Sequence, residues 1–174
     1  MTTSEVQLVG FVGLGAMGGP MCANLTSKSP VPVCVYDLNF AAVSKAVETG
    51  AVAATGLEDV ARADLVFVCV PGEAETRSVF LGEGGLCDHA SEGTTFIDCT
   101  TATVEINREV ADALRRWAVN LLMRPSHAGF PMPQTGRYLS PLELRQRFSR
   151  GLLHGWVIWV LTLHTVVRSE PERS

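Results

Sequence analysis

Three glycines at fixed spacing constrain the fold of this chain more than any other feature of its sequence. They belong to the run Gly13-Leu14-Gly15-Ala16-Met17-Gly18, which separates an apolar stretch, residues 6–12, from a stretch of helical length, residues 17–27. A glycine-rich turn from strand to helix is typical of α/β domains in which a phosphate approaches the backbone at a helix N-terminus. We expect the first glycine to allow a tight turn, the second to leave room for a phosphate, and the third to let the helix lie close to the strand.

Further apolar runs alternate with stretches of helical length. The apolar runs are residues 6–12, 31–36, 65–70 and 95–97, and the helical stretches are residues 17–27, 40–49 and 104–118. Strands that are buried on both faces lack polar alternation, because helices cover both sides of a parallel sheet. The last helix carries an apolar face opposite charged residues, and Thr103 is expected to cap it. This order, β-α-β-α-β-α-β, predicts an α/β fold with a doubly wound, Rossmann-type parallel sheet.

An acidic residue, Asp37, follows the second apolar run, 24 residues after Gly13. A carboxylate at about this separation from the glycine run accepts hydrogen bonds from the ribose of a bound dinucleotide. It also repels a 2′-phosphate, and the next residue, Leu38, is not the arginine that would bind one. The sequence therefore predicts a nicotinamide dinucleotide site that favours NAD, with NADP as the alternative, and Leu38 and Asn39 belong to it together with the glycine run. In the alternative interpretation, the glycines only join strand to helix and Asp37 is an ordinary surface acid.

The run from Phe11 to Leu25 resembles the opening signature of the β-hydroxyacid dehydrogenases, the family of 3-hydroxyisobutyrate and 6-phosphogluconate dehydrogenases. Two later segments are also similar to that family, Val68-Cys69-Val70-Pro71 and Asp98-Cys99-Thr100-Thr101. The resemblance implies that Val70, Pro71 and Thr101 lie along the nicotinamide side of the cofactor. It also implies hydride transfer between the cofactor and a 3-hydroxy acid. Glu75 departs from the asparagine that family members often place there.

Simpler roles remain open for these segments. Pro71 can serve only to end a strand, and Thr100 and Thr101 can serve only the turn before the next helix. Cys99 is expected to be a small core residue.

The resemblance ends at about residue 122. We therefore expect a nucleotide-binding domain over residues 1–122 and a divergent, irregular tail over residues 123–174, in place of the family's all-helical domain. Residues 123–141 contain four prolines and two glycines, a density that neither helices nor strands tolerate. The resemblance implies a catalytic lysine in the missing region, but the sequence has no lysine after Lys45. No catalytic residue is assigned, and His127 is either an ordinary loop histidine or a substitute proton donor.

The tail contains sixteen mostly apolar residues from Leu152 to Val167. A membrane-spanning helix needs about 20 apolar residues, so a membrane anchor is the less favoured interpretation. We expect instead a buried strand or helix, or a segment covered by a partner or a second copy of the chain. A truncated or misassembled gene would also produce such a tail.

Composition excludes several classes of partner and cofactor. The formal net charge of −4 provides no basic surface for nucleic acid. The five cysteines include no C-x-x-C pair, and the four histidines show no metal-ligand spacing, so we expect neither a metal nor a disulfide framework. The short polar start lacks signal-peptide features, which predicts a cytoplasmic protein.

Two functional classes follow from these observations. The first is the cofactor-binding half of a 3-hydroxyacid dehydrogenase-like oxidoreductase. The second is a nucleotide-binding or redox-sensing module without catalysis. A separate possibility is a non-functional fragment, in which the tail is not an evolved domain.

Overall fold

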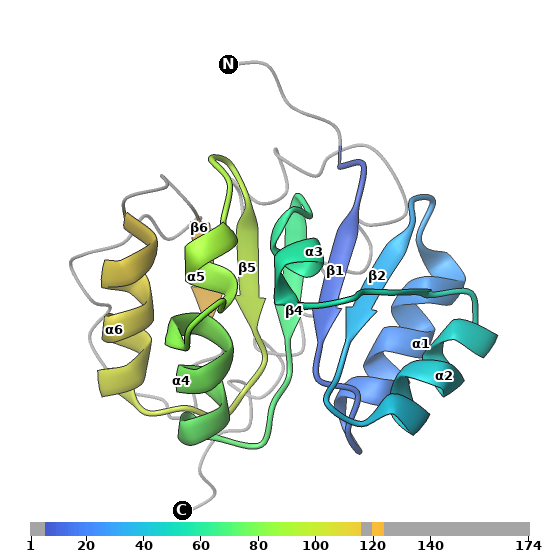
Figure 1. Ribbon diagram of the computed structural model, residues 1–174, viewed down its shortest axis with the longest axis horizontal. Coiled ribbons are helices and arrows are strands. Elements are labelled where there is room, and N and C mark those ends of the chain that lie inside the picture. The colour runs from blue at the N-terminus through green and yellow to red at the C-terminus, as the bar shows by residue number, and fades with distance from the viewer. Residues whose placement is uncertain (1–5, 116–119, 124–174) are drawn as a thin grey trace, which may run out of the picture.

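Six parallel strands form one sheet in the order β3-β2-β1-β4-β5-β6 (Figure 1). The computed structural model describes residues 6–115 and 120–123. The strands are β1 (Val9–Val12), β2 (Val33–Tyr36), β3 (Val52–Ala53), β4 (Leu65–Val68), β5 (Thr95–Asp98) and β6 (Asn120–Met123). The helices are α1 (Gly18–Lys28), α2 (Phe40–Glu48), α3 (Leu57–Ala61), α4 (Glu73–Leu81), α5 (Leu86–His89) and α6 (Val104–Leu114). This strand order is the one typical of Rossmann-type sheets, so the predicted fold class is confirmed.

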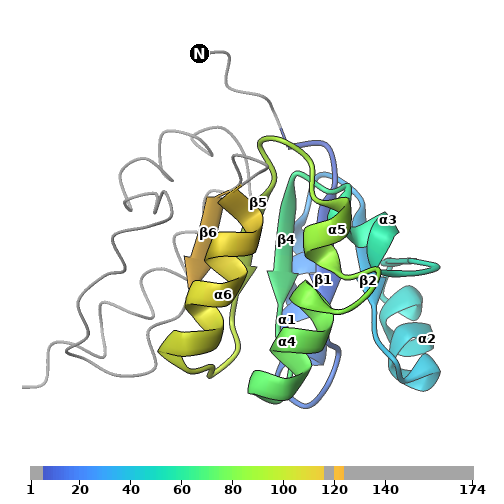
Figure 2. The ribbon, with the colours of Figure 1, turned by 60° about the vertical axis from the view of Figure 1, so that its left-hand side comes forward.

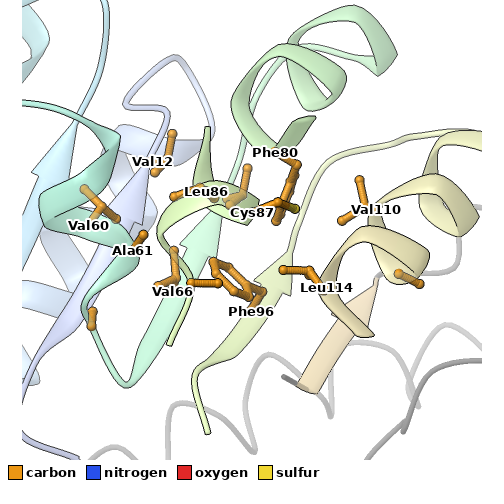
Figure 3. Packing of buried hydrophobic residues seen from close by; sticks show 14 of the residues in the cluster. Val12, Val60, Ala61, Val66, Phe80, Leu86, Cys87, Phe96, Val110 and Leu114 are labelled. Atoms are coloured by element: carbon orange, nitrogen blue, oxygen red, sulfur yellow. The ribbon is translucent and has the colours of Figure 1, made fainter. Parts of the chain in front are cut away.

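Helices cover both faces of the sheet (Figures 1 and 2). On one face, α1 and α2 contribute Cys22, Leu25 and Val43 to a buried cluster that includes Phe11 and Phe67. On the other face, α3, α4, α5 and α6 pack on the sheet. Their cluster is shown in Figure 3 and includes Val60, Phe80, Leu86, Phe96, Val110 and Leu114. Because β1, β4 and β5 are buried along their whole length, their apolar runs show no alternation.

The predicted elements are present, most of them with shorter bounds, whereas β5 is one residue longer than predicted and α1 is shifted by one residue. Other elements were missed. No helix was predicted between residues 70 and 95, where the structure has α4 and α5, and α3, β3 and β6 were not predicted either. Strand β3 has two residues, both exposed, and α3 has five, so neither is long enough to show a period. Apart from Met123, which ends β6, the predicted tail lies outside the described residues, and so do His127 and the run from Leu152 to Val167. The boundary after residue 122 stays a prediction.

The prediction that the side chain of Thr103 caps α6 is wrong, because this side chain makes no capping hydrogen bond. Its hydroxyl donates a hydrogen bond to Glu73 on α4, with 2.9 Å between the oxygens. Glu73 also pairs with Arg77, and Arg77 pairs in turn with Glu109 on α6. The hydroxyl of Thr103 therefore takes part in a polar contact between two helices, which the local sequence of α6 does not reveal.

The pair of rings Phe80 and Phe96 provides a test of the core. Their centroids are 5.6 Å apart in an edge-to-face arrangement, and both side chains are fully buried. We expect Phe96→Ala to reduce the free energy of unfolding by about 3–5 kcal/mol, measured by urea denaturation. The matched control is Phe40→Ala, because Phe40 is 81% exposed and its loss should change stability by less than about 0.5 kcal/mol. Equal effects of the two substitutions would contradict the described packing.

Candidate functional site

The candidate site lies at the carboxyl edge of the sheet, where the loops after β1, β2, β4 and β5 meet. All strands run parallel, so their carboxyl ends share this edge. The chain leaves β1 toward β2 on one side and later returns to place β4 on the other side. Ligands of doubly wound sheets bind at such a reversal of strand order. The predicted residues of the glycine run and of the Asp37, Val70 and Thr101 segments are brought to this one edge.

Each of the three glycines occupies a different environment. Gly13 has φ of +90°, and a Cβ there would collide with the carbonyl oxygen of Cys69. A Cβ on Gly18 would collide with the carbonyl oxygen of Gly13, which shows how closely α1 begins against the end of β1. A Cβ on Gly15 would meet no atom within 4 Å. The first and third glycines are thus required by the protein itself, whereas the second borders open space.

The carboxylate of Asp37 joins two of the loops. Its Oδ2 accepts a hydrogen bond from the backbone N–H of Leu14 at 2.6 Å, and its Oδ1 accepts one from Asn39 at 2.7 Å. The side chain of Asn39 accepts a bond from the backbone N–H of Ala41 and so caps α2. Asp37 therefore holds the glycine run in a fixed position relative to the start of α2, a structural role that its sequence position does not predict.

The side chains of the predicted residues differ in exposure. Leu14 is buried among the residues beneath α1 and α2, so that a ligand at this edge would meet its backbone only. Met17 and Leu38 are 68% and 92% exposed. Pro71 and Thr101 are also exposed, and Val70 is half-buried.

A second set of bonds joins the loops after β4 and β5. The Thr100 hydroxyl lies 3.2 Å from the backbone nitrogen of Val70 and accepts its hydrogen bond. The backbone N–H of Thr100 donates to Oδ1 of Asp98 at 2.8 Å. Thr100 and Asp98 are both buried, whereas Thr101, the residue singled out from the sequence, is exposed. Sequence reasoning missed this pair, because its role depends on the register that places Val68 beside Asp98.

Burial raises the pKa of the Asp98 carboxyl above its ordinary value, and the hydrogen bonds from Thr100 partly oppose this shift. Among residues 6–115 and 120–123, no group of three or more metal-ligating side chains is present. No helix in this part of the chain is long and apolar enough to cross a membrane.

Residues 8–129 match the family described as the NAD binding domain of 6-phosphogluconate dehydrogenase. The chain belongs to this family. The match confirms the resemblance to β-hydroxyacid dehydrogenases and makes the glycine run part of an NAD-binding domain.

Relatives of this NAD-binding domain are longer proteins. A 3-hydroxyisobutyrate dehydrogenase of Pseudomonas aeruginosa is 38% identical over 122 residues, which are 70% of this chain and 41% of that protein. The solved 3-hydroxyisobutyrate dehydrogenase of Mycobacterium tuberculosis with L-serine has 28% identity and a TM-score of 0.62, over 72% of this chain and 42% of that one. A solved complex with NADP⁺ and the compound 2-OPP has 27% identity and a TM-score of 0.60, over 65% and 40% of the respective chains. The chain thus spans about two fifths of the length of these relatives.

The glycine geometry predicts opposite effects for two alanine substitutions. Gly18→Ala should lower the free energy of unfolding by about 1–3 kcal/mol, because its Cβ meets backbone that has to move. Gly15→Ala should change stability by less than about 0.5 kcal/mol, because its Cβ meets nothing. Urea denaturation of the two variants, compared with the unsubstituted chain, measures both effects. Loss of stability in Gly15→Ala would show that the loop is packed differently.

The buried carboxyl of Asp98 predicts a pH dependence of stability. Since folding raises its pKa, the folded chain holds this proton more tightly than the unfolded chain, and the resulting stabilisation is lost as pH rises from about 4 through the raised pKa. Asp98→Asn keeps an oxygen for the N–H of Thr100 but carries no charge. As pH rises from 4 to 7, the parent should lose this contribution and the variant should not. The free energy of unfolding of the variant, measured by urea denaturation at several pH values, should therefore rise relative to that of the parent. A constant difference across that range would rule out the proposed effect of burial.

Proposed function

We propose that this chain is the cofactor-binding part of a 3-hydroxyacid dehydrogenase-like oxidoreductase and binds NAD at the carboxyl edge of its sheet. The observation that carries the proposal is the geometry of the glycine run. Gly13 and Gly18 are close-packed, whereas Gly15 between them faces open space. Of the three glycines, only Gly15 has room for a side chain within the protein, and yet it is a glycine. A bound pyrophosphate would explain this, because it would need the space that a Cβ would fill.

The pyrophosphate would be held by the loop backbone from Gly15 through Gly18, including Ala16 and Met17. Helix α1 begins at Gly18 and contributes the positive end of its dipole. No lysine or arginine belongs to the glycine run itself, so its contacts would come from backbone N–H groups. The residues present therefore suit a phosphate bound through main-chain donors.

Asp37 would bind the adenosine ribose. An ionised carboxylate has acceptor sites for about four hydrogen bonds, and Leu14 and Asn39 use one on each oxygen. The remaining capacity suits the two ribose hydroxyls. A 2′-phosphate would meet the same negative charge, and the exposed Leu38 beside it supplies no compensating cation. This arrangement supports NAD over NADP, although the solved complex with NADP⁺ shows that a similar domain accompanies the phosphorylated cofactor.

The nicotinamide would lie toward the loops after β4 and β5. Val70, Pro71 and Thr101 would line it, and the bond between Thr100 and Val70 would keep the two loops together. When bound, the nicotinamide ring exchanges a hydride with the substrate, which we propose to be a small 3-hydroxy acid. The match covers about two fifths of the length of the relatives, and the substrate is therefore proposed from the family alone.

We further propose that this chain binds the cofactor without turning over substrate by itself. Its two lysines, Lys28 and Lys45, lie in α1 and α2, away from the loops after β4 and β5. The proton donor of the reaction would have to come from another chain or from residues beyond the described ones. The lack of a lysine near the loops after β4 and β5, among the described residues, also favours the second candidate, a nucleotide-binding module without catalysis.

Isothermal titration with NADH and with NADPH tests the cofactor assignment. We expect NADH to bind more tightly than NADPH, because Asp37 repels the 2′-phosphate. Asp37→Asn should weaken NADH binding by about 1.5 kcal/mol or more, roughly tenfold, since it removes a charged acceptor. The substitution should also reduce the difference in affinity between NADH and NADPH, because the charge that repels the 2′-phosphate is gone.

The matched control is Asp64→Asn. The carboxylate of Asp64 likewise accepts two backbone hydrogen bonds, from Gln7 and Leu8, but it lies at the opposite edge of the sheet, before β4. This variant should bind NADH like the parent chain. Equal losses in the two variants would mean that Asp37 acts through stability alone, and an absence of NADH binding in the parent chain would refute the proposed function. Release of NADH from NAD on addition of a 3-hydroxy acid would refute the absence of turnover.

A further inference from the structure

Cys69 and Cys99 are neighbours on the loops that leave β4 and β5. The last paired residues of these strands are Val68 and Asp98, and the two cysteines are the next residue of each chain segment. Hydrogen bonds continue through this position, since the backbone N–H of Cys99 donates to the carbonyl oxygen of Val68 at 2.8 Å and the Thr100 hydroxyl accepts from Val70. Both cysteine side chains pack on the same cluster, beneath α1 and α2, and therefore lie on one face of the sheet.

This spacing is compatible with a disulfide. Adjacent strands of a sheet lie about 4.8 Å apart. Disulfide-linked residues have Cα atoms roughly 4.4–6.8 Å apart. Residues that continue the register of two paired strands fall in that range. Since the Cβ atoms of a disulfide lie roughly 3.5–4.5 Å apart, bond formation requires the two side chains to move slightly toward each other.

These two cysteines are also more accessible than the other three. Cys22, Cys34 and Cys87 are buried, with at most 7% of each residue exposed, whereas Cys69 and Cys99 are half-buried. Burial raises the pKa of the Cys22 and Cys34 thiols, which keeps them in the unreactive protonated form. The two cysteines that lie side by side are thus the two with the greater solvent exposure.

Cys69 also contacts the glycine run. Its carbonyl oxygen lies too close to Gly13 for a Cβ there, and its Cβ is 3.4 Å from the position of a Cβ on Gly18. A shift of Cys69 toward Cys99 would therefore move atoms that pack against Gly13 and Gly18.

We propose that Cys69 and Cys99 form a reversible disulfide when the chain meets a hydroperoxide, and that this bond weakens cofactor binding by displacing the glycine run. One thiolate attacks the peroxide, the O–O bond breaks, and a sulfenic acid forms with release of water or an alcohol. The second thiolate attacks that sulfur, the S–O bond breaks, and water leaves as the S–S bond forms. Two thiols are oxidised and one hydroperoxide is reduced. The effect on cofactor rests on the proposed function, whereas the disulfide does not.

Peptide mapping tests the disulfide. The full chain is treated with hydrogen peroxide, remaining thiols are blocked with N-ethylmaleimide in denaturant, and the unreduced protein is digested with trypsin and Glu-C. Cleavage after Arg77 separates Cys69 from Cys99, and cleavage after Glu92 separates Cys99 from Cys87. We expect a peptide pair linked through Cys69 and Cys99 to be the main disulfide, to disappear in Cys69→Ser and in Cys99→Ser, and to persist in the control Cys87→Ser. Dithiothreitol should remove it.

Two results would overturn this part of the proposal. One is oxidation of Cys69 and Cys99 to unlinked sulfinic acids, and the other is a linkage of either residue mainly to Cys22, Cys34 or Cys87.

Titration with NADH tests the effect on the site. The oxidised chain should bind NADH about fivefold or more weakly than the reduced chain, which is the lower end of typical coupling between sites. Dithiothreitol should restore the affinity, and Cys99→Ser should bind equally before and after peroxide. Equal affinity of the oxidised and reduced chains would refute the coupling. If the reduced chain binds no NADH, the proposed function fails while the mapping result stands by itself.

Discussion

The contact of Gly18 with the carbonyl group of Gly13 determines how the rest of this domain is arranged. It brings the first turn of α1 against the end of β1, closer than any side chain would allow. From that starting point the helix directs Cys22 and Leu25 into the cluster that covers β1 and β4. The same contact leaves the intervening Gly15 at the edge of the sheet, facing open space. One backbone contact therefore serves both the packing of the core and the shape of the candidate site.

Much of this arrangement could be predicted from the sequence, because its determinants are local. The run of residues 65–68 is wholly apolar, which is the pattern of a strand between two helical layers, and three glycines at fixed spacing indicate a tight turn into a helix. Helix α4 was missed because charged residues such as Glu73 and Arg77 occupy much of its exposed surface, and few apolar positions mark its buried face. The bonds of Thr100 and Thr103 were missed for a different reason. Their partners, Val70 and Glu73, lie 30 residues away in the chain. They become neighbours only when β5 pairs with β4 and α6 packs beside α4.

The candidate site depends on polar groups that also maintain the fold. Asp37 connects the glycine run with the start of α2, and Asp98 and Thr100 connect the loops after β4 and β5. Placing Asp98 in a buried position opposes its ionisation, so the domain loses some stability at neutral pH in return for a defined loop. Fixed loops reduce the entropy that a ligand has to remove on binding. The polar residues at this edge are thus positioned before any ligand arrives.

The position of β1 in the sheet has a consequence for synthesis of the chain. This strand is the first to be made, but it pairs with β2 on one side and with β4 on the other, and the end of β2 at Tyr36 is followed by β4 only at Leu65. At about 5–20 residues per second, a ribosome needs on the order of seconds to produce the segment between them. During this interval the backbone N–H and C=O groups along one edge of β1 have no strand to pair with. Early binding by a chaperone, or a delay of β1–β2 pairing until β4 emerges, would protect the growing chain from aggregation at this edge.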